Sequence, residues 1–425
     1  MSSSLEHVVV VGASLAGLRA CEGLRQHGFE GRLTLVGDEA EVPYDRPPLS
    51  KAFLAGDWDA ERIRLRKPEV FESLRLDLRL GARAVTLDTA AASLGLADGS
   101  SLAYDGLVLA TGATPRRLDD QPDVEGVLSL RTLRDSTELR SLLTADRGRP
   151  TRLVVVGAGF IGLEAASTAR RLGCDVVVLE GAPAPLVRSL GADMGRAITL
   201  LHASHGVPVH CGVRLLGIEH DGTRVTGVRV DGMAGEPVDG SILTADVVLV
   251  GVGVVPSTDW LADSGLHLAD GIVCDESLCA GPPNVFAAGD CVRWPNAVFA
   301  GHDDAVMRVE HWTNAAEQGA AAARNLLLAA GDEPTEPFSS VPFFWSDQYD
   351  QRVQFVGRAH GGDEVRVIAG TPGDGPFTAL YGWQGRLRGA LGLTMPKLVM
   401  RFRQLVAEQT PLDDAVARAA EWTSN

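Results

Sequence analysis

The chain has 425 residues, more than one hydrophobic core usually serves, so we expect two or three domains. Its 45% hydrophobic and 22% charged residues are typical of a globular protein, and a formal net charge of −16 argues against nucleic acid as the main partner, because phosphate binding needs a basic surface. We find no run of about 18 apolar residues that would predict a membrane span and no secretory signal in residues 1–7, so we expect a cytoplasmic location.

The first elements follow the order strand, turn, helix, strand. An apolar run at 7–11 predicts a strand buried on both faces of a parallel sheet, helical periodicity runs from 15 to 26, and a second strand is expected at 33–36. The turn reads Gly12-Ala13-Ser14-Leu15-Ala16-Gly17, so Ser14 stands at the middle glycine of G-x-G-x-x-G. Asp38, 21 residues beyond Gly17, is placed to bond a ribose.

The same pattern recurs about 145 residues later, after a strand at 107–113 that breaks at Thr111-Gly112. It comprises a strand at 152–156, a helix at 160–172 and a strand at 176–179. Here the loop Gly157-Ala158-Gly159-Phe160-Ile161-Gly162 matches G-x-G-x-x-G in full. Gly157 permits the tight turn, Gly159 lets the backbone approach a pyrophosphate, and Gly162 lets helix and strand pack closely.

Glu180 follows Gly162 by 18 residues, at the end of the next strand. A carboxylate there accepts hydrogen bonds from a ribose 2′-hydroxyl and repels a 2′-phosphate. No lysine or arginine immediately follows it, so the second loop favours NADH over NADPH.

Two more buried strands are expected at 246–254 and 285–289. The second ends at Asp290, which would face the ligand crevice at the carboxyl end of a sheet and could bond the ribityl hydroxyls of a flavin. An alanine-rich helix at 318–330 and a proline-containing linker at 331–342 follow. The remainder predicts short strands at 352–356, 365–368, 378–381 and 387–391, then helices at 396–407 and 412–421.

These elements predict an α/β protein with two Rossmann-like dinucleotide-binding domains and a C-terminal α+β domain. We place the FAD-binding domain at 1–114 and 246–330, the NAD-binding domain at 115–245 and the C-terminal domain at 331–425.

The cysteines predict neither a disulfide framework nor a metal site. Cys274 and Cys279 have the C-x4-C spacing of some redox-active disulfides, but they lie in a strand-like stretch, 271–279, far from the first nucleotide loop. We interpret them as unpaired thiols.

Seven segments in this order resemble one family: GASLAG, PYDRPPLSK (43–51), LATGA, GAGFIGLE (157–164), FAAGD, EHWTNA (310–315) and FFWSDQYD (343–350). They are similar to the ferredoxin and putidaredoxin reductases that serve bacterial cytochromes P450 and ring-hydroxylating dioxygenases. The resemblance covers nearly the whole chain and implies a glutathione-reductase-like fold, noncovalent FAD, NADH as hydride donor to flavin N5, and single-electron transfer to a small iron–sulfur protein.

The resemblance also implies roles for individual residues. Lys51 and Glu164 would be the catalytic pair, with Lys51 near flavin N5 and Glu164 at the flavin and nicotinamide. Contacts to FAD are expected from Gly12, Ala16, Gly17, Asp38, Lys51, Ala84, Arg131, Asp290 and Trp312, and contacts to NADH from Gly157, Gly159, Gly162 and Glu180. His311 receives no catalytic role, and Trp345 is either a contact near the flavin or a core residue.

A Lys51–Glu164 pair is also reasonable on physical grounds. Glu164 lies early in a helix, where the dipole favours a carboxylate. A buried lysine would stabilise negative charge on a reduced flavin, and without a carboxylate partner it would carry a large desolvation cost.

The segment from Arg386 to Arg403 holds five basic residues and no acidic one: Arg386, Arg388, Lys397, Arg401 and Arg403. In an acidic protein this patch would steer a small acidic ferredoxin, most simply of the 2Fe-2S type, although a solvated helix face has the same composition.

Other activities of the same fold remain as alternatives. NADH oxidases, NADH peroxidases and coenzyme A disulfide reductases need a cysteine near the flavin, and none occurs from Arg46 to Lys51, while Cys21 lies in the first helix. A rubredoxin reductase or another NADH:acceptor flavoprotein stays open. So does a slow-turnover redox-sensing flavoprotein resembling apoptosis-inducing factor, which shares the lysine–glutamate feature.

Overall fold

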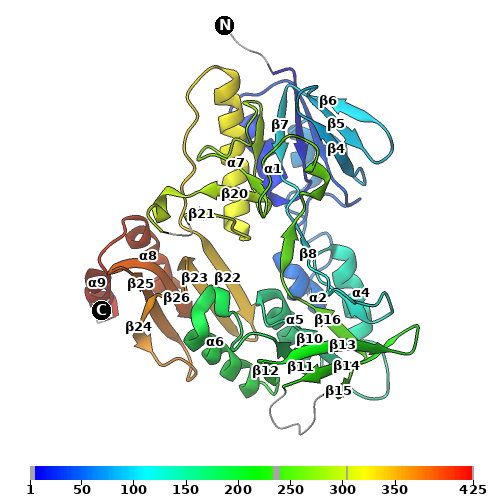
Figure 1. The fold of residues 1–425 in the computed structure, drawn as a ribbon, viewed down its shortest axis with the longest axis vertical. Coiled ribbons are helices and arrows are strands. Elements are labelled where there is room, and N and C mark those ends of the chain that lie inside the picture. The colour runs from blue at the N-terminus through cyan, green and yellow to red at the C-terminus, as the bar shows by residue number, and fades with distance from the viewer. Residues whose placement is uncertain (1–4, 233–239, 303–304, 424–425) are drawn as a thin grey trace. The chain divides into compact units, whose positions relative to one another are not determined.

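The computed structural model describes residues 5–232, 240–302 and 305–423 (Figure 1). They form two compact units, which we describe separately: Met1–Asp45, Arg64–Thr114 and Val255–Phe343 make the first, and Arg46–Ile63, Pro115–Val254 and Phe344–Asn425 the second. Among the helices of these described ranges, none is both long enough and apolar enough to cross a membrane.

The first unit is built on a parallel sheet of order β19-β7-β1-β2-β3. Its central strand β1 (His7–Val11) carries four buried valines, as expected for a strand covered on both faces. The other strands are β2 (Arg32–Val36), β3 (Leu76–Arg79), β7 (Gly106–Leu109) and β19 (Val285–Ala287). The expected strand–helix–strand unit is therefore present, with α1 (Leu15–Gln26) between β1 and β2.

Helices α1 and α7 (Trp312–Ala330) of the first unit lie side by side (Figure 1). Gly319 makes this close approach possible, because a Cβ atom there would lie 2.3 Å from the carbonyl oxygen of Ala16. Helix α7 begins at Trp312, six residues before the predicted start, so Trp312 stands at its N-terminus.

Smaller elements complete the unit: α3 (Pro68–Ser73), an antiparallel sheet of β4 (Ala84–Asp88), β5 (Ser93–Leu96) and β6 (Ser101–Ala103), and the short strands β18 (Ile272–Val273), β20 (Val292–Pro295) and β21 (Val306–Met307).

The second unit contains a parallel sheet of order β12-β11-β10-β16-β9. It consists of β9 (Val127–Leu128), β10 (Arg152–Val156), β11 (Asp175–Glu180), β12 (Val209–Cys211) and β16 (Val247–Val250). The helices α4 (Leu133–Leu143), α5 (Phe160–Arg171) and α6 (Val187–Ser204) accompany it, and β13 (Arg214–His220), β14 (Val225–Asp231) and β15 (Ser241–Thr244) form a separate antiparallel sheet. The last three strands were not predicted.

Strand β16 corrects one predicted boundary. The sequence assigned residues from 246 onward to the FAD-binding segment, but β16 pairs in parallel with β10, with Leu153 opposite Val247. The reason is that both segments are apolar strands, and composition does not reveal which sheet a buried strand joins. The chain returns to the first unit only from Val255.

The C-terminal part of the second unit is an antiparallel sheet of order β22-β23-β26-β25-β24, followed by two helices. The predicted strands are found, slightly longer, as β23 (Gln351–Gly357), β24 (Glu364–Gly370), β25 (Phe377–Trp383) and β26 (Arg386–Leu393), and the helices as α8 (Pro396–Ala407) and α9 (Leu412–Thr423). Strand β22 (Phe343–Gln348) was recognised as a motif but not as a strand. The stretch 271–279, expected to be strand-like, contains only the two-residue β18, because its paired segment with β20 ends at Val273.

Candidate active site

The glycine loop of the first unit is closely packed. Gly12 has φ of 118°, and a Cβ atom there would lie 2.0 Å from the carbonyl oxygen of Ala110. A Cβ atom at Gly17 would lie 1.9 Å from the oxygen of Gly12, so the start of α1 sits against the turn. Ser14 is the N-cap residue of α1, in an extended conformation, and its hydroxyl makes no capping hydrogen bond. The first turn of the helix therefore keeps N–H groups available for an anion.

The loop of the second unit repeats this geometry at its outer glycines and is open at its middle glycine. Gly157 has φ of 102°, with a hypothetical Cβ atom 2.3 Å from the oxygen of Gly251, and a Cβ atom at Gly162 would lie 2.4 Å from the oxygen of Gly157. At Gly159, the N-cap residue of α5, the nearest atom to a Cβ position is the oxygen of Gly251, 3.9 Å away. This open space at a helix N-terminus fits a pyrophosphate.

The two predicted ribose acids differ in how they are held. Glu180, half-buried at the end of β11, accepts hydrogen bonds from the backbone N–H groups of Ala158 at 2.7 Å and Ala182 at 2.8 Å. Its carboxylate is thereby fixed to the glycine loop. The Asp38 side chain is 66% exposed and lies 4.0 Å from Arg83, the residue before Ala84. Ala84 itself is half-buried at the start of β4.

Three further predicted flavin contacts lie in the first unit. Ala16 lies close to the turn before Asp290, since a Cβ atom at Gly289 would be 3.1 Å from the Cβ atom of Ala16. Beside this turn, the buried Gln318 accepts the Gly289 N–H at 2.8 Å, and its amide nitrogen has no hydrogen-bond partner among the described residues. Trp312 donates its indole N–H to Asp45 at 2.7 Å. A buried amide group without a partner, beside two glycine turns, fits a polar cofactor better than a closed core.

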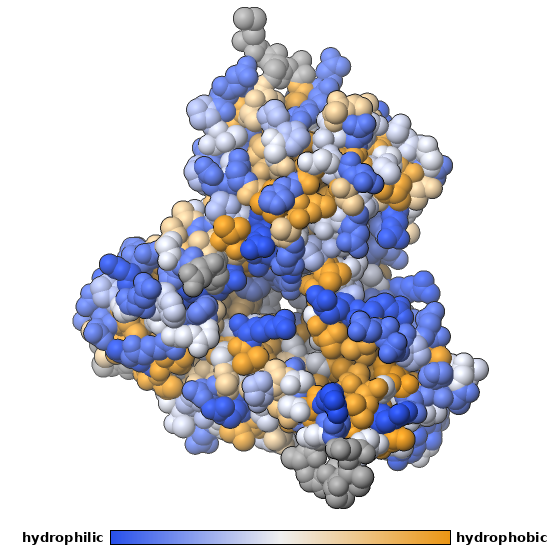
Figure 2. Space-filling view, viewed as in Figure 1, coloured by the Kyte–Doolittle hydropathy of each residue, from blue (hydrophilic) through white to orange (hydrophobic). Residues whose placement is uncertain are grey.

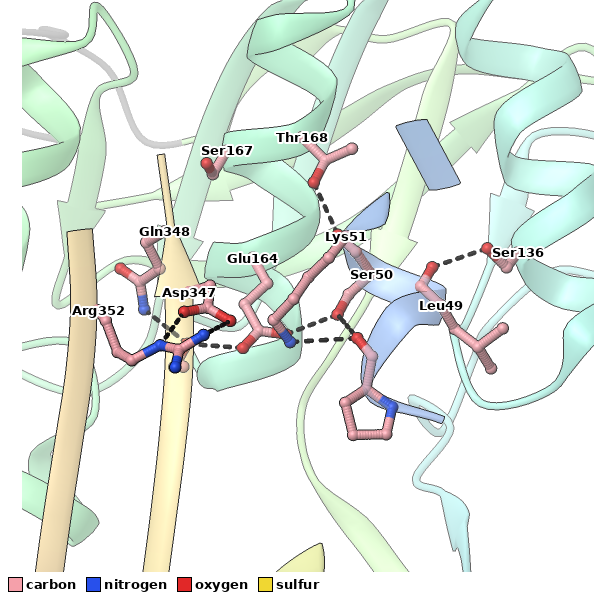
Figure 3. A network of polar contacts seen from close by, with 12 residues as sticks. Leu49, Ser50, Lys51, Ser136, Glu164, Ser167, Thr168, Asp347, Gln348 and Arg352 are labelled. Carbon is pink, nitrogen blue, oxygen red and sulfur yellow. Dashed lines mark hydrogen bonds and ion pairs between the residues drawn. The ribbon is translucent and has the colours of Figure 1, made fainter. Parts of the chain in front are cut away.

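Lys51 and Glu164 form the predicted ion pair, inside the second unit (Figure 3). The Lys51 Nζ atom lies 2.5 Å from Glu164 Oε2 and also donates to the carbonyl oxygen of Pro47 at 3.2 Å. Glu164 is only 4% exposed. Its Oε2 atom accepts a second hydrogen bond from Ser50 Oγ at 2.5 Å, and Oε1 accepts one from Ser346 Oγ at 2.7 Å. A buried carboxylate with three donors is well compensated for its loss of water.

The short helical turn η1 (Pro47–Ser50), which precedes Lys51, is fixed by buried hydroxyl groups. Ser136 of α4 donates to the carbonyl oxygen of Leu49, and Thr168 of α5 donates to that of Ser50, both at 2.7 Å (Figure 3). The predicted flavin contact Arg131 joins the same region, because its carbonyl oxygen accepts a hydrogen bond from Arg46 at 2.6 Å. The backbone just before Lys51 is therefore held by side chains of α4 and α5.

Sequence reasoning did not identify Ser50, Ser346 or Gln348 as parts of this site. Ser346 and Gln348 are fully buried on the same side of β22 as Phe344, whereas Trp345 and Asp347 are half-buried. The period-two alternation of FFWSDQ could have indicated this, since polar residues on the inward face of a strand need partners.

The cysteines carry no disulfide chemistry here. All six are free, and Cys21 is fully buried in α1, where burial holds the pKa of its thiol far above the ordinary value. Cys274 and Cys279 are also free, as predicted, and burial raises the pKa of both thiols. Thiols kept protonated in this way are poor nucleophiles. In the part of the chain that the structure describes, no cluster of three or more His, Cys, Asp and Glu residues could hold a metal ion.

The basic C-terminal segment is only partly at the surface. Arg388 is 3% exposed and donates to the carbonyl oxygen of Arg358 at 2.9 Å, so its inclusion in a docking patch was wrong. It lies in β26, where every residue after Arg386 is buried, so its charged side chain must find internal acceptors. Arg386 and Lys397 are exposed, Arg403 is half-buried, and Arg401 is exposed with its guanidinium 5.3 Å from the ring centre of Trp422. Hydrophilic residues cover most of the visible surface over α8 and α9 (Figure 2).

Comparison with known proteins agrees with this geometry. Residues 6–319 match the family model described as pyridine nucleotide-disulphide oxidoreductase, and residues 343–422 match the one described as reductase C-terminal. Rhodocoxin reductase of Rhodococcus erythropolis is 37% identical over 95% of this chain and 90% of its own length. The ferredoxin–NAD(+) reductase component of the anthranilate 1,2-dioxygenase system of Burkholderia cepacia is 35% identical over 95% of each chain. The crystal structure of the covalent putidaredoxin reductase–putidaredoxin complex superposes with a TM-score of 0.86 at 32% identity, covering 96% of this chain and 94% of that one.

Proposed function

The chain belongs to the pyridine nucleotide-disulphide oxidoreductase family, and from this premise we propose that it is an FAD-dependent NADH:ferredoxin reductase. It would supply single electrons to a small iron–sulfur protein that serves a cytochrome P450 or a ring-hydroxylating oxygenase. The three relatives named above are reductases, and the similarity to this chain covers 90% or more of each of them.

One observation carries the choice of activity within the family. The buried Lys51–Glu164 pair occupies the turn and helix beside the second glycine loop, where no thiol is present between Arg46 and Lys51. A thiol relay to a disulfide substrate therefore has no nucleophile there. Bound FAD supplies the chemistry that side chains lack, because it accepts a hydride from NADH and delivers electrons one at a time.

The residues of this chain would bind, orient and shield the two nucleotides. We assign the contacts to FAD to Gly12, Ala16, Gly17, Asp38, Ala84, Asp290 and Trp312 and, as the resemblance implies, to Lys51 and Arg131. We assign NADH to residues 115–254, held by Gly157, Gly159, Gly162 and Glu180. The Lys51 ammonium would stabilise negative charge on the reduced cofactor, and the hydrogen bond to Glu164 holds that ammonium in place.

The test is an absorption spectrum of the purified protein, followed by anaerobic titration with NADH and then with NADPH. We expect flavin bands that NADH bleaches at low concentration, and little bleaching by NADPH, because the carboxylate of Glu180 disfavours a 2′-phosphate. A colourless protein that cannot be reconstituted with FAD would contradict the proposal.

We further propose that the electron acceptor is an acidic 2Fe-2S ferredoxin that docks near the exposed basic residues Arg386, Lys397 and Arg401, with Arg403 beside them. Lys397 and Arg401 are four residues apart on α8 and so share one helix face. Complementary charge would steer the encounter and increase its rate at low salt.

Reversing both charges, Lys397→Glu with Arg401→Glu, should raise the KM for ferredoxin by about tenfold at low salt, with a smaller effect at high salt. Reduction of ferricyanide should be unchanged, since that small acceptor needs no docking surface. Arg418→Glu, an exposed charge reversal on α9, is the matched control. An unchanged ferredoxin KM in the folded double variant would remove this face from consideration.

A further inference from the structure

A continuous line of hydrogen bonds runs through the second unit and ends on the carboxylate of the active-site glutamate. Tyr349 Oη lies 3.0 Å from His202 Nδ1, and His202 Nε2 lies 3.0 Å from Gln348 Oε1. Gln348 Nε2 donates to Ser346 Oγ at 3.1 Å, and Ser346 Oγ lies 2.7 Å from Glu164 Oε1. The line therefore connects α6 and the end of β22 with α5, and Figure 3 shows its last part around Glu164 and Gln348.

The donors in this line all point the same way. Glu164 accepts only, so Ser346 must donate to it, and the Ser346 oxygen is then free to accept from the amide of Gln348. The Gln348 oxygen requires a donor, which makes His202 the tautomer protonated at Nε2 and leaves Nδ1 to accept from the hydroxyl of Tyr349. Such a chain polarises each successive bond toward the carboxylate.

The surroundings keep the line in this state. His202, Ser346 and Gln348 are each 0% exposed, and burial lowers the pKa of His202 to about 4, so the ring is neutral near pH 7. Tyr349 stacks on His205 with ring centres 3.7 Å apart. Each polar group of the line has a partner, as a buried network requires.

Ser346, the last donor in the line, helps to fix the orientation of the Glu164 carboxylate. Oε2 of Glu164 is shared by Lys51 and Ser50, while Ser346 is the donor to Oε1. Without that third bond the carboxylate could rotate about its terminal torsion, which is broad for glutamate. The ammonium of Lys51 would then lose its fixed partner.

We propose that Ser346, supported by Gln348 and His202, is a positioning residue that fixes the Glu164 carboxylate and, through it, the Lys51 ammonium. The C-terminal domain would thus take part in the active site of the reductase and not only in partner binding. The expected change in flavin potential rests on the proposed function. The expected change in the reactivity of Lys51 does not, and it can be measured independently.

The test compares three variants of the purified holoprotein. Ser346→Ala removes the donor to Glu164, Ser346→Thr keeps a hydroxyl, and Ser167→Ala removes a buried hydroxyl between α5 and the end of β22 without touching the carboxylate. The readouts are acylation of Lys51 by an amine-reactive reagent, followed by peptide mass spectrometry, and the midpoint potential of the flavin. Thermal unfolding shows whether each variant is folded.

We expect Ser346→Ala to be acylated at Lys51 about tenfold faster than the wild-type protein, since the ammonium loses a fixed carboxylate partner. Its flavin potential should fall, because a less fixed cation stabilises the reduced cofactor less well. Ser346→Thr should restore both values, and Ser167→Ala should change neither. If Ser346→Ala destabilises the fold, Gln348→Met, which keeps the Ser346 hydroxyl but removes both its amide donor and the acceptor of His202, should give a smaller increase in acylation.

Acylation and potential that stay at the wild-type values in folded Ser346→Ala, or that change equally in Ser167→Ala, would overturn the positioning role. A wild-type protein that NADH does not reduce would instead contradict the proposed function. The acylation of Lys51 needs no NADH, so it would still decide the role of Ser346.

Discussion

The two glycine loops of this chain can be compared position by position. The first glycines, Gly12 and Gly157, both have strongly positive φ and leave no room for a Cβ atom. The third glycines, Gly17 and Gly162, both bring a helix against the preceding turn. At the middle position the loops differ, because one has Ser14 and the other Gly159, and both residues are extended N-caps with negative φ. The fold thus requires the outer glycines, whereas a middle glycine leaves space for a ligand.

The acids that follow the loops differ in a related way. Glu180 is bonded to the backbone of its own loop, whereas Asp38 is largely exposed. The second loop and its acid therefore form one preorganised unit, whereas the acid after the first loop is open to solvent.

The largest expected effect is on an outer glycine. Gly12→Ala would place a methyl group 2.0 Å from the oxygen of Ala110 at φ of 118°, so we expect a loss of about 4 kcal/mol or more in the free energy of unfolding. Urea denaturation measures this, and flavin content reports the folded fraction.

Gly28→Ala is the matched control for that variant. Gly28 also has positive φ, 86°, but nothing lies within 4 Å of its Cβ position, so only about 1 kcal/mol should be lost. Equal losses in the two variants would mean that backbone strain alone, and not close packing of the loop, determines the need for glycine.

The next effect concerns the ribose acids. Glu180→Gln keeps one acceptor oxygen for the loop but removes the charge, and we expect the KM for NADH to rise about 30-fold, equivalent to about 2 kcal/mol. The preference for NADH over NADPH should shrink at the same time, because the repulsion of a 2′-phosphate is lost.

Asp38→Asn is the corresponding change in the first unit. We expect FAD content close to that of the wild-type protein, since an exposed hydrogen bond contributes less than about 1 kcal/mol and other segments hold the cofactor. A loss of FAD in Asp38→Asn as large as the loss of NADH binding in Glu180→Gln would remove the contrast between the two sites.

Sequence patterns predicted the regular part of this fold well. The repeated strand–helix–strand unit was predicted with boundaries within one residue at α1, α5 and β2, because a fully buried strand and an amphipathic helix have distinct periods. Which sheet β16 joins was not predicted, since pairing between distant strands leaves no local pattern. The family resemblance correctly brought Lys51 and Glu164 together, across 113 residues of sequence.

The polar residues behind that pair were not predicted. Ser346 and Gln348 contribute to the site because β22 turns them inward and α5 lies beside it, and both facts depend on tertiary structure. Arg388 was misassigned for a similar reason, because a basic residue on a strand reads as exposed until its face is known.

An effect smaller than that of Glu180→Gln is expected at the middle position of the loops. Gly159→Ser gives the second loop the arrangement of the first, and the extended backbone of Gly159, with φ of −78°, accepts a serine without strain. We therefore expect unchanged stability and FAD content, but a KM for NADH about tenfold higher, equivalent to about 1.4 kcal/mol, because the side chain takes space from the pyrophosphate.

In the reciprocal variant Ser14→Gly, FAD content should not change, and stability should fall by only a few tenths of a kcal/mol, roughly the difference between these residues at an N-cap. If Gly159→Ser binds NADH as the wild-type protein does, the pyrophosphate does not lie in the open space at this helix N-terminus. A glycine at the middle position would then be no more important for nucleotide binding in the second loop than in the first.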